Sequence, residues 1–158
     1  MALVGRIVVA ICWMKWVFVT TAYASEEARD ALSFIVLGDV SHPLVKEIEF
    51  TDCKSKISVD SILFGVIEIH NDWNEALWKS AGYSLNEQGK IELRIACKNE
   101  CSRYSGAEGV SEMFDLAGIM VGVDLKKTIS LEIAASIKRV DRALEDIKRQ
   151  CPGVESKY

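Results

Sequence analysis

Proline and histidine are scarce in this 158-residue chain, which contains 2 of each. So little proline, together with 49% hydrophobic and 27% charged residues, argues against a disordered or fibrous protein. The sequence also lacks a Gly-x-Ser-x-Gly motif and a glycine-rich phosphate-binding loop. The histidines, His42 and His70, have no fixed spacing to the cysteines, so zinc is not indicated. The sequence therefore predicts a folded globular protein, with no indication of a bound metal or cofactor.

The sequence also has no excess of basic over acidic residues. The chain has a formal charge of −4, and the segment that follows residue 24 is more acidic, because the cations Arg6 and Lys15 precede it. Basic residues are interleaved with acidic ones, as in the segment 138–142. A protein that binds the phosphate backbone normally presents a basic face. The composition therefore argues against nucleic acid as a partner.

Residues 1–24 have the pattern of a secretory signal peptide. Arg6 precedes two apolar runs, residues 7–14 and 16–19, and Ala22 and Ala24 have the small-x-small spacing of a cleavage site. From Ser25 onward the chain becomes abruptly polar. We therefore expect cleavage between Ala24 and Ser25, and a periplasmic or secreted mature protein.

The alternative to cleavage is a membrane anchor that is retained. Lys15 argues against it, because a charge near the middle of a membrane span costs on the order of 2.5–3.5 kcal/mol. The same lysine shortens each apolar run of the predicted signal peptide. We expect no stable membrane insertion after cleavage, and a single α+β domain over residues 25–158.

Four cysteines follow the predicted cleavage site, namely Cys53, Cys97, Cys101 and Cys151. An even number in an exported chain favours two disulfides, and four cysteines allow three pairings. Cys97 and Cys101 are separated by three residues just after a predicted strand, and one tight turn brings such positions within bonding range. We therefore expect a Cys97–Cys101 bridge, which leaves Cys53 to pair with Cys151.

Hydrophobic periodicity predicts several strands. Residues 48–50 and 57–59 alternate around a polar connection and indicate a hairpin, and residues 91–97 alternate most regularly. The run 62–69 is apolar on both faces, which is typical of a central strand covered on both sides. The apolar segment 113–125 is too short to span a bilayer, and we expect a buried strand or turn there.

Helices are expected at both ends of the mature chain. Residues 25–38 have acidic side chains in the first turn, which is typical of a helix, although the β-branched pair Ile35-Val36 also suits a strand. Residues 72–79 resemble a short capped helix, with a strand as the alternative. An amphipathic pattern from Ser130 to about residue 150 predicts a C-terminal helix. The expected fold class is α+β, with a small antiparallel sheet packed by this helix and stabilised by disulfides.

One place in the sequence suits acid–base chemistry. His70 ends a predicted strand, and Asp72 and Glu68 are close enough in sequence to supply a carboxylate. No nucleophile with a supporting motif accompanies them. A histidine that ends a strand at the surface is the simpler explanation of the pattern, so we assign no catalytic residues.

The order of several short segments resembles small uncharacterised exported proteins of alphaproteobacteria. The segments that carry this resemblance follow the leader and are 36–39, Asp52-Cys53, 142–144 and 151–153. Those proteins have no assigned activity, so the resemblance implies no catalytic residues. We expect an exported, non-catalytic protein that binds an unknown protein partner or associates with the envelope. The alternative is a small hydrolase-like periplasmic enzyme that uses His70 with Asp72 or Glu68.

Overall fold

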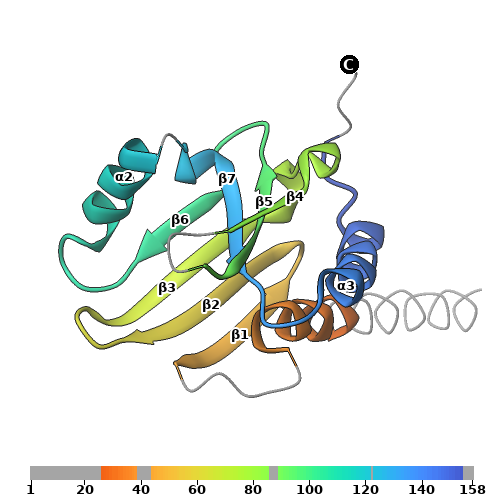
Figure 1. Ribbon diagram of the computed structural model, residues 1–158, viewed down its shortest axis with the longest axis horizontal. Coiled ribbons are helices and arrows are strands. Elements are labelled where there is room, and N and C mark those ends of the chain that lie inside the picture. Colours follow the sequence, from red (N-terminus) through yellow and green to blue (C-terminus); the bar gives the residue numbers. More distant parts are fainter. Residues whose placement is uncertain (1–25, 39–43, 86–88, 122, 155–158) are drawn as a thin grey trace, which may run out of the picture.

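The structure is a computed structural model that describes residues 26–38, 44–85, 89–121 and 123–154. The predicted signal peptide and its cleavage site, Ala24 and Ser25, lie outside the described residues. Figure 1 shows the arrangement of the described elements.

Two antiparallel sheets form the centre of the fold (Figure 1). The first has the order β1-β2-β3-β6, with bounds Val45–Thr51, Lys54–Ser61, Gly65–Asp72 and Ser102–Ser105. The second has the order β4-β5-β7, with bounds Gly82–Leu85, Ile91–Ala96 and Thr128–Glu132. The expected α+β class is confirmed, with two small sheets in place of one.

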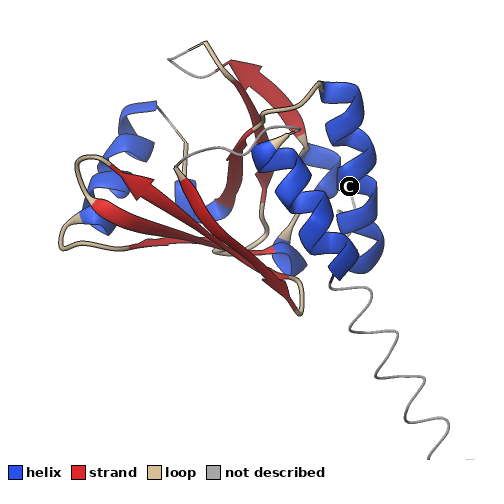
Figure 2. Ribbon diagram, turned by 90° about the horizontal axis from the view of Figure 1, so that it is seen from below, coloured by secondary structure: helices blue, strands red, loops and turns tan. Residues whose placement is uncertain are grey.

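Two helices cover one side of this assembly. The N-terminal helix, described over residues 26–37, lies beside α3 (Ile137–Gln150) in both views (Figures 1 and 2). Side chains of both helices and both sheets share one hydrophobic cluster, whose fully buried members include Leu32, Ile35, Ile57, Leu93, Ile95, Ile129, Val140 and Ile147. The amphipathic stripe of the C-terminal helix therefore packs on the protein's own sheets.

The predicted C-terminal helix begins too early in the sequence-based assignment. Residues 128–132 form β7, which pairs with β5 in register from Glu92↔Glu132 to Ala96↔Thr128, and α3 starts only at Ile137. The residue spacing from Ile133 to Ile137 continues the helical period and hides this boundary. Here tertiary strand pairing overrides the local pattern.

The expected strand or turn at 113–125 is wrong, because α2 (Val110–Val121) occupies most of it. Val110 is 1% exposed, and Phe114, one helical turn later, stacks on Tyr104 of β6 with ring centroids 4.1 Å apart. Positions i and i+4 share one helix face, so the face of α2 that carries the buried Val110 is the one that packs on β6 through Phe114. The Gly106–Gly109 segment before it is a turn, as expected.

Residues 62–64 do not belong to a covered central strand, which corrects a second expectation. The β2–β3 register ends at Ser61↔Gly65, so the three apolar residues between them form the hairpin connection. Gly65 has φ +67°, a conformation that glycine adopts without steric cost. β3 itself lies between β2 and β6, as an inner strand should.

The predicted short helix at 72–79 is replaced by two 3-10 turns, η1 (Trp73–Glu75) and η2 (Trp78–Ser80). Asp72 caps the first turn through Asn74 N, as its sequence position indicates. The helix stops because Ala76 is extended and forms a bridge with Cys97.

Both expected disulfides are confirmed. Cys53 is bonded to Cys151, and Cys97 to Cys101, with Cα–Cα distances of 5.6 and 6.2 Å. The first bridge ties the β1–β2 turn to the end of α3, and the second closes the short loop after β5.

Candidate functional site

The predicted acid–base residues lie on the polar face of β3. Glu68 and His70 are two residues apart on this strand, so their side chains point to the same side, and β6 adds Ser105 directly opposite Glu68. His70 Nε2 lies 3.2 Å from both Glu68 Oε2 and Ser105 Oγ. Ser105 Oγ in turn donates to Glu68 Oε2 at 3.3 Å. The structure therefore brings His70 and Glu68 together and adds a serine that the sequence did not single out.

This trio does not have the geometry of an activated nucleophile. A catalytic histidine accepts the serine proton on one ring nitrogen while a carboxylate orients the other nitrogen. Here a single nitrogen, Nε2, faces both Glu68 and Ser105, and the serine hydroxyl donates to the carboxylate. Asp72 is directed elsewhere, with its Oδ2 3.9 Å from Lys54 Nζ and its Oδ1 accepting from Asn74. The arrangement is a polar network on a sheet surface.

The surroundings of His70 are open. The side chains of His70 and Glu68 are 31% and 40% exposed. A broad depression of about 590 Å³ beside His70 and Asp72 continues toward Lys126 and the start of α2. No three histidine, cysteine or acidic side chains within the described ranges are placed to share a metal ion. The site offers exposed polar groups and no enclosed volume around the imidazole.

The β2–β3 hairpin presents the most conspicuous apolar surface. Ile62 is 94% exposed, Leu63 82% and Val66 51%, and we call these three residues the hairpin-tip patch. Leu44 is also 39% exposed, and its carbonyl accepts a hydrogen bond from Asp60 N beside the hairpin. Single exposed apolar residues are normal, but several adjacent ones at one protruding turn are a feature of interaction sites.

Acidic residues dominate the strand positions next to this patch. Glu47 and Glu68 both lie opposite Ser58, and Asp60 lies opposite Val66. Asp60 pairs with Lys46 at 3.2 Å, and Glu47 lies 3.7 Å from Lys56, which is also 2.7 Å from Glu49. Three carboxylates, those of Glu47, Asp60 and Glu68, thus lie near the apolar tip. The lysines beside them are Lys46, which pairs with Asp60, and Lys56, which lies between Glu47 and Glu49.

The hairpin-tip patch was missed at the level of sequence because its residues continue directly into β3. Ile62-Leu63-Phe64 precedes Gly65 and the strand residues Val66 to Ile69 without a polar break. The single available signal was Gly65, since an isolated glycine within a strand pattern marks a turn or bulge.

Comparisons with family models, curated proteins and solved structures found no match for this chain. None of the helices in the described part of the chain has both the length and the apolar character needed to cross a membrane.

Proposed function

We propose that this chain is an exported, non-catalytic protein of the periplasm or extracellular space that binds another protein through the hairpin-tip patch. The observation that carries this proposal is the exposure of Ile62 and Leu63, at 94% and 82%, on a turn held by paired strands. Leaving large apolar side chains in water costs free energy that burial in a partner recovers, at about 25 cal/mol per Å². Two disulfides support an oxidising compartment.

A protein partner suits this patch better than a lipid surface does. Envelope-binding loops commonly combine apolar residues with lysine and arginine, which are attracted to anionic headgroups. The positions next to the tip carry Glu47, Asp60 and Glu68, and these carboxylates are repelled by such headgroups. The polar network at His70 supports the non-catalytic part of the proposal, because its histidine is not arranged to activate Ser105.

The experiment that tests this function is affinity capture from the extracytoplasmic fraction of cells that make the protein. The bait is the mature chain, compared with the double variant Ile62→Ser/Leu63→Ser. The control is Leu85→Ser, which removes a side chain that is 70% exposed on β4 and lies outside the patch. All three baits should have the same melting temperature, because surface changes away from the core are nearly neutral.

We expect one protein to be retained by the parent and by Leu85→Ser and to be lost from the tip variant. Retention of the same proteins by the tip variant would refute the proposal. Hydrolysis of a substrate that depends on His70 would favour the alternative, an enzyme.

A further inference from the structure

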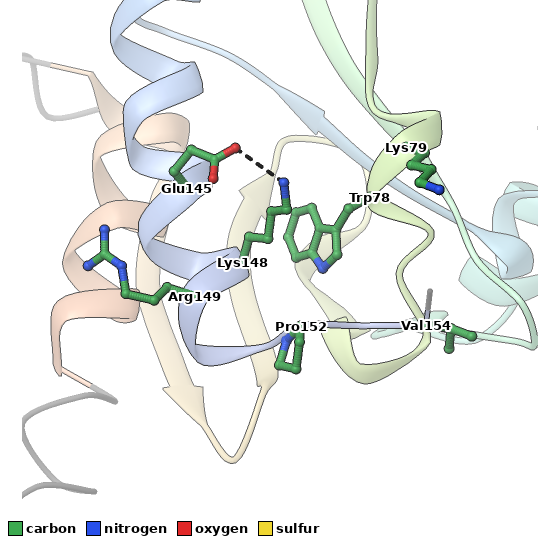
Figure 3. A pocket seen from close by; sticks show the side chains of 7 residues that line it. All are labelled: Trp78, Lys79, Glu145, Lys148, Arg149, Pro152 and Val154. Carbon is green, nitrogen blue, oxygen red and sulfur yellow. Dashed lines mark hydrogen bonds and ion pairs between the residues drawn. The ribbon is translucent and has the colours of Figure 1, made fainter. Parts of the chain in front are cut away.

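A second surface, at the opposite side of the molecule from the hairpin, has the features of a ligand groove. It lies between η2, the last turn of α3 and the chain that follows α3, with a volume of about 590 Å³ (Figure 3). We call its apolar lining residues, Trp78, Pro152 and Val154, the floor, and its charged lining residues, Lys79, Glu145, Lys148 and Arg149, the rim. We call this surface the Trp78 groove. Figure 1 places α3 and the β2–β3 hairpin at opposite sides of the fold, so the two surfaces are separate.

The walls of the Trp78 groove are fixed by several independent contacts. The Trp78 indole N–H donates to the Cys151 carbonyl at 2.9 Å, and Cys151 is itself bonded to Cys53. Val154 N donates to Ala76 O at 3.0 Å, which holds the last described residue beside η1. Trp78 also stacks on the fully buried Trp73, with ring centroids 5.8 Å apart. A ligand that binds here meets a preformed surface and loses little affinity to ordering it.

Cations outnumber carboxylates among the side chains that line the groove. Of the described residues, three cations and one carboxylate, Glu145, line it, whereas the whole chain has a formal charge of −4. Lys148 lies 3.4 Å from Glu145, whereas Arg149 lies 2.9 Å from Asp146 and 3.7 Å from Glu27 of the N-terminal helix and points away from Trp78 (Figure 3). These pairs are solvent-exposed, with 47% and 65% of the lysine and arginine side chains accessible, and exposed pairs are weak enough to exchange partners.

We infer that the Trp78 groove binds an acidic peptide segment, with an apolar side chain over the indole and carboxylates at Lys148 and Lys79. Trp78 has its N–H occupied by Cys151, so it offers a ring surface and not a hydrogen-bond donor. A glycan would require several amide or carboxylate side chains beside the ring to bind its hydroxyl groups, and among the residues that the structure describes Glu145 is the only such side chain lining the groove. Apolar contact on the floor and charge contact at the rim together fit a peptide better.

Intrinsic fluorescence provides a direct test. The chain has 4 tryptophans, of which Trp13 and Trp16 belong to the predicted leader, so the mature protein emits from Trp73 and Trp78 alone. The probe is the peptide acetyl-Glu-Glu-Phe-Glu-Glu-amide, titrated at low salt. Matched probes are acetyl-Lys-Lys-Phe-Lys-Lys-amide, which reverses the charge, and polygalacturonate, which supplies carboxylates on a glycan.

We expect a saturable change in emission with the acidic peptide and none with the lysine peptide. Lys148→Glu should weaken binding roughly tenfold, and Lys79→Glu/Lys148→Glu should weaken it further. The control is Lys138→Glu, an equal charge change about ten residues away on α3, which should bind like the parent. Tighter binding of polygalacturonate, equal binding of both peptides, or no loss in the Lys148 variant would overturn the inference. These results leave the hairpin-tip proposal unaffected, because none of the variants alters the hairpin.

Discussion

Cys53 and Cys151 are 98 residues apart in the sequence, and their Cα atoms lie 5.6 Å apart across a disulfide. Cys53 lies in the β1–β2 turn with φ 60°, and its carbonyl accepts from the N–H of the buried Trp73. Cys151 is fully buried directly after α3. One covalent bond thus joins the first hairpin to the end of the last helix, and a backbone hydrogen bond links this junction to the buried Trp73.

The two disulfides should contribute unequally to stability. In the chain-entropy model a loop of roughly 100 residues contributes up to about 4.7 kcal/mol, and a five-residue loop about 2 kcal/mol. The double variant Cys53→Ser/Cys151→Ser should therefore melt well below Cys97→Ser/Cys101→Ser in calorimetry. Peptide mapping without reductant should recover the Cys53 and Cys151 peptides joined. Equal melting temperatures, or Cys53 joined to Cys97 or Cys101, would contradict this account.

Gly153 and Gly65 allow a matched test of close packing beside Trp78. Both have positive φ, +65° and +67°, so an alanine carries the same backbone penalty of about 1–2 kcal/mol at each. A Cβ on Gly153 would lie 2.3 Å from Ala76 O, whereas nothing lies within 4 Å of one on Gly65. Gly153→Ala should therefore lower the free energy of unfolding by clearly more than Gly65→Ala. Urea denaturation measures the difference, and equal losses would show that this approach is not tight.

Stability should fall at alkaline pH. Burial, and secondarily the negative charge of Glu92, raises the pKa of Tyr104 to about 12, against about 10 in an unfolded chain. Between these values the unfolded chain loses the phenol proton while the native protein retains it, so rising pH favours unfolding. Burial, followed by the Asp141 hydrogen bond, also raises the pKa of Tyr83.

The measurement is the free energy of unfolding from pH 9 to pH 12 for the parent and for Tyr104→Phe. The parent should lose stability as the pH rises above about 10, and the variant should show a shallower loss. An unchanged slope in Tyr104→Phe would rule out a raised pKa for this tyrosine.

Elements whose residues interact locally were predictable from the sequence. The helix at 26–37, the β1–β2 hairpin and the strand β5 follow directly from their periodicity. The disulfide pairing followed from the spacing of Cys97 and Cys101 and from elimination. Apart from the Cys53–Cys151 bond, which followed by elimination alone, these features depend on short segments of the chain, where hydrophobic pattern and turn chemistry agree.

Other elements depended on partners that are distant in the sequence. Thr128 to Glu132 became a strand because β5 pairs with it, and Ala76 ended η1 through its bridge with Cys97. Ser105, which meets His70, comes from β6 and is 35 residues away. The hairpin-tip patch was hidden by apolar residues that continue into β3. Periodicity does not distinguish a buried apolar run from an exposed turn.

Export can be tested independently of binding. If residues 1–24 are a signal peptide, the exported protein should begin at Ser25 or within a residue or two of it, as the Ala22 and Ala24 pattern indicates. Mass spectrometry of the intact protein determines this end. A membrane-bound product that still begins at Met1 would demonstrate the anchor alternative.

Photo-crosslinking in living cells tests most directly whether the hairpin-tip patch binds a protein partner. A photoreactive amino acid is placed at Leu63 and, as a control, at Leu116, which is 62% exposed on α2. We predict one discrete protein adduct from position 63 that is absent from position 116. Labelling of lipid alone, of a second copy of the chain, or of the same proteins from both positions would contradict the claim.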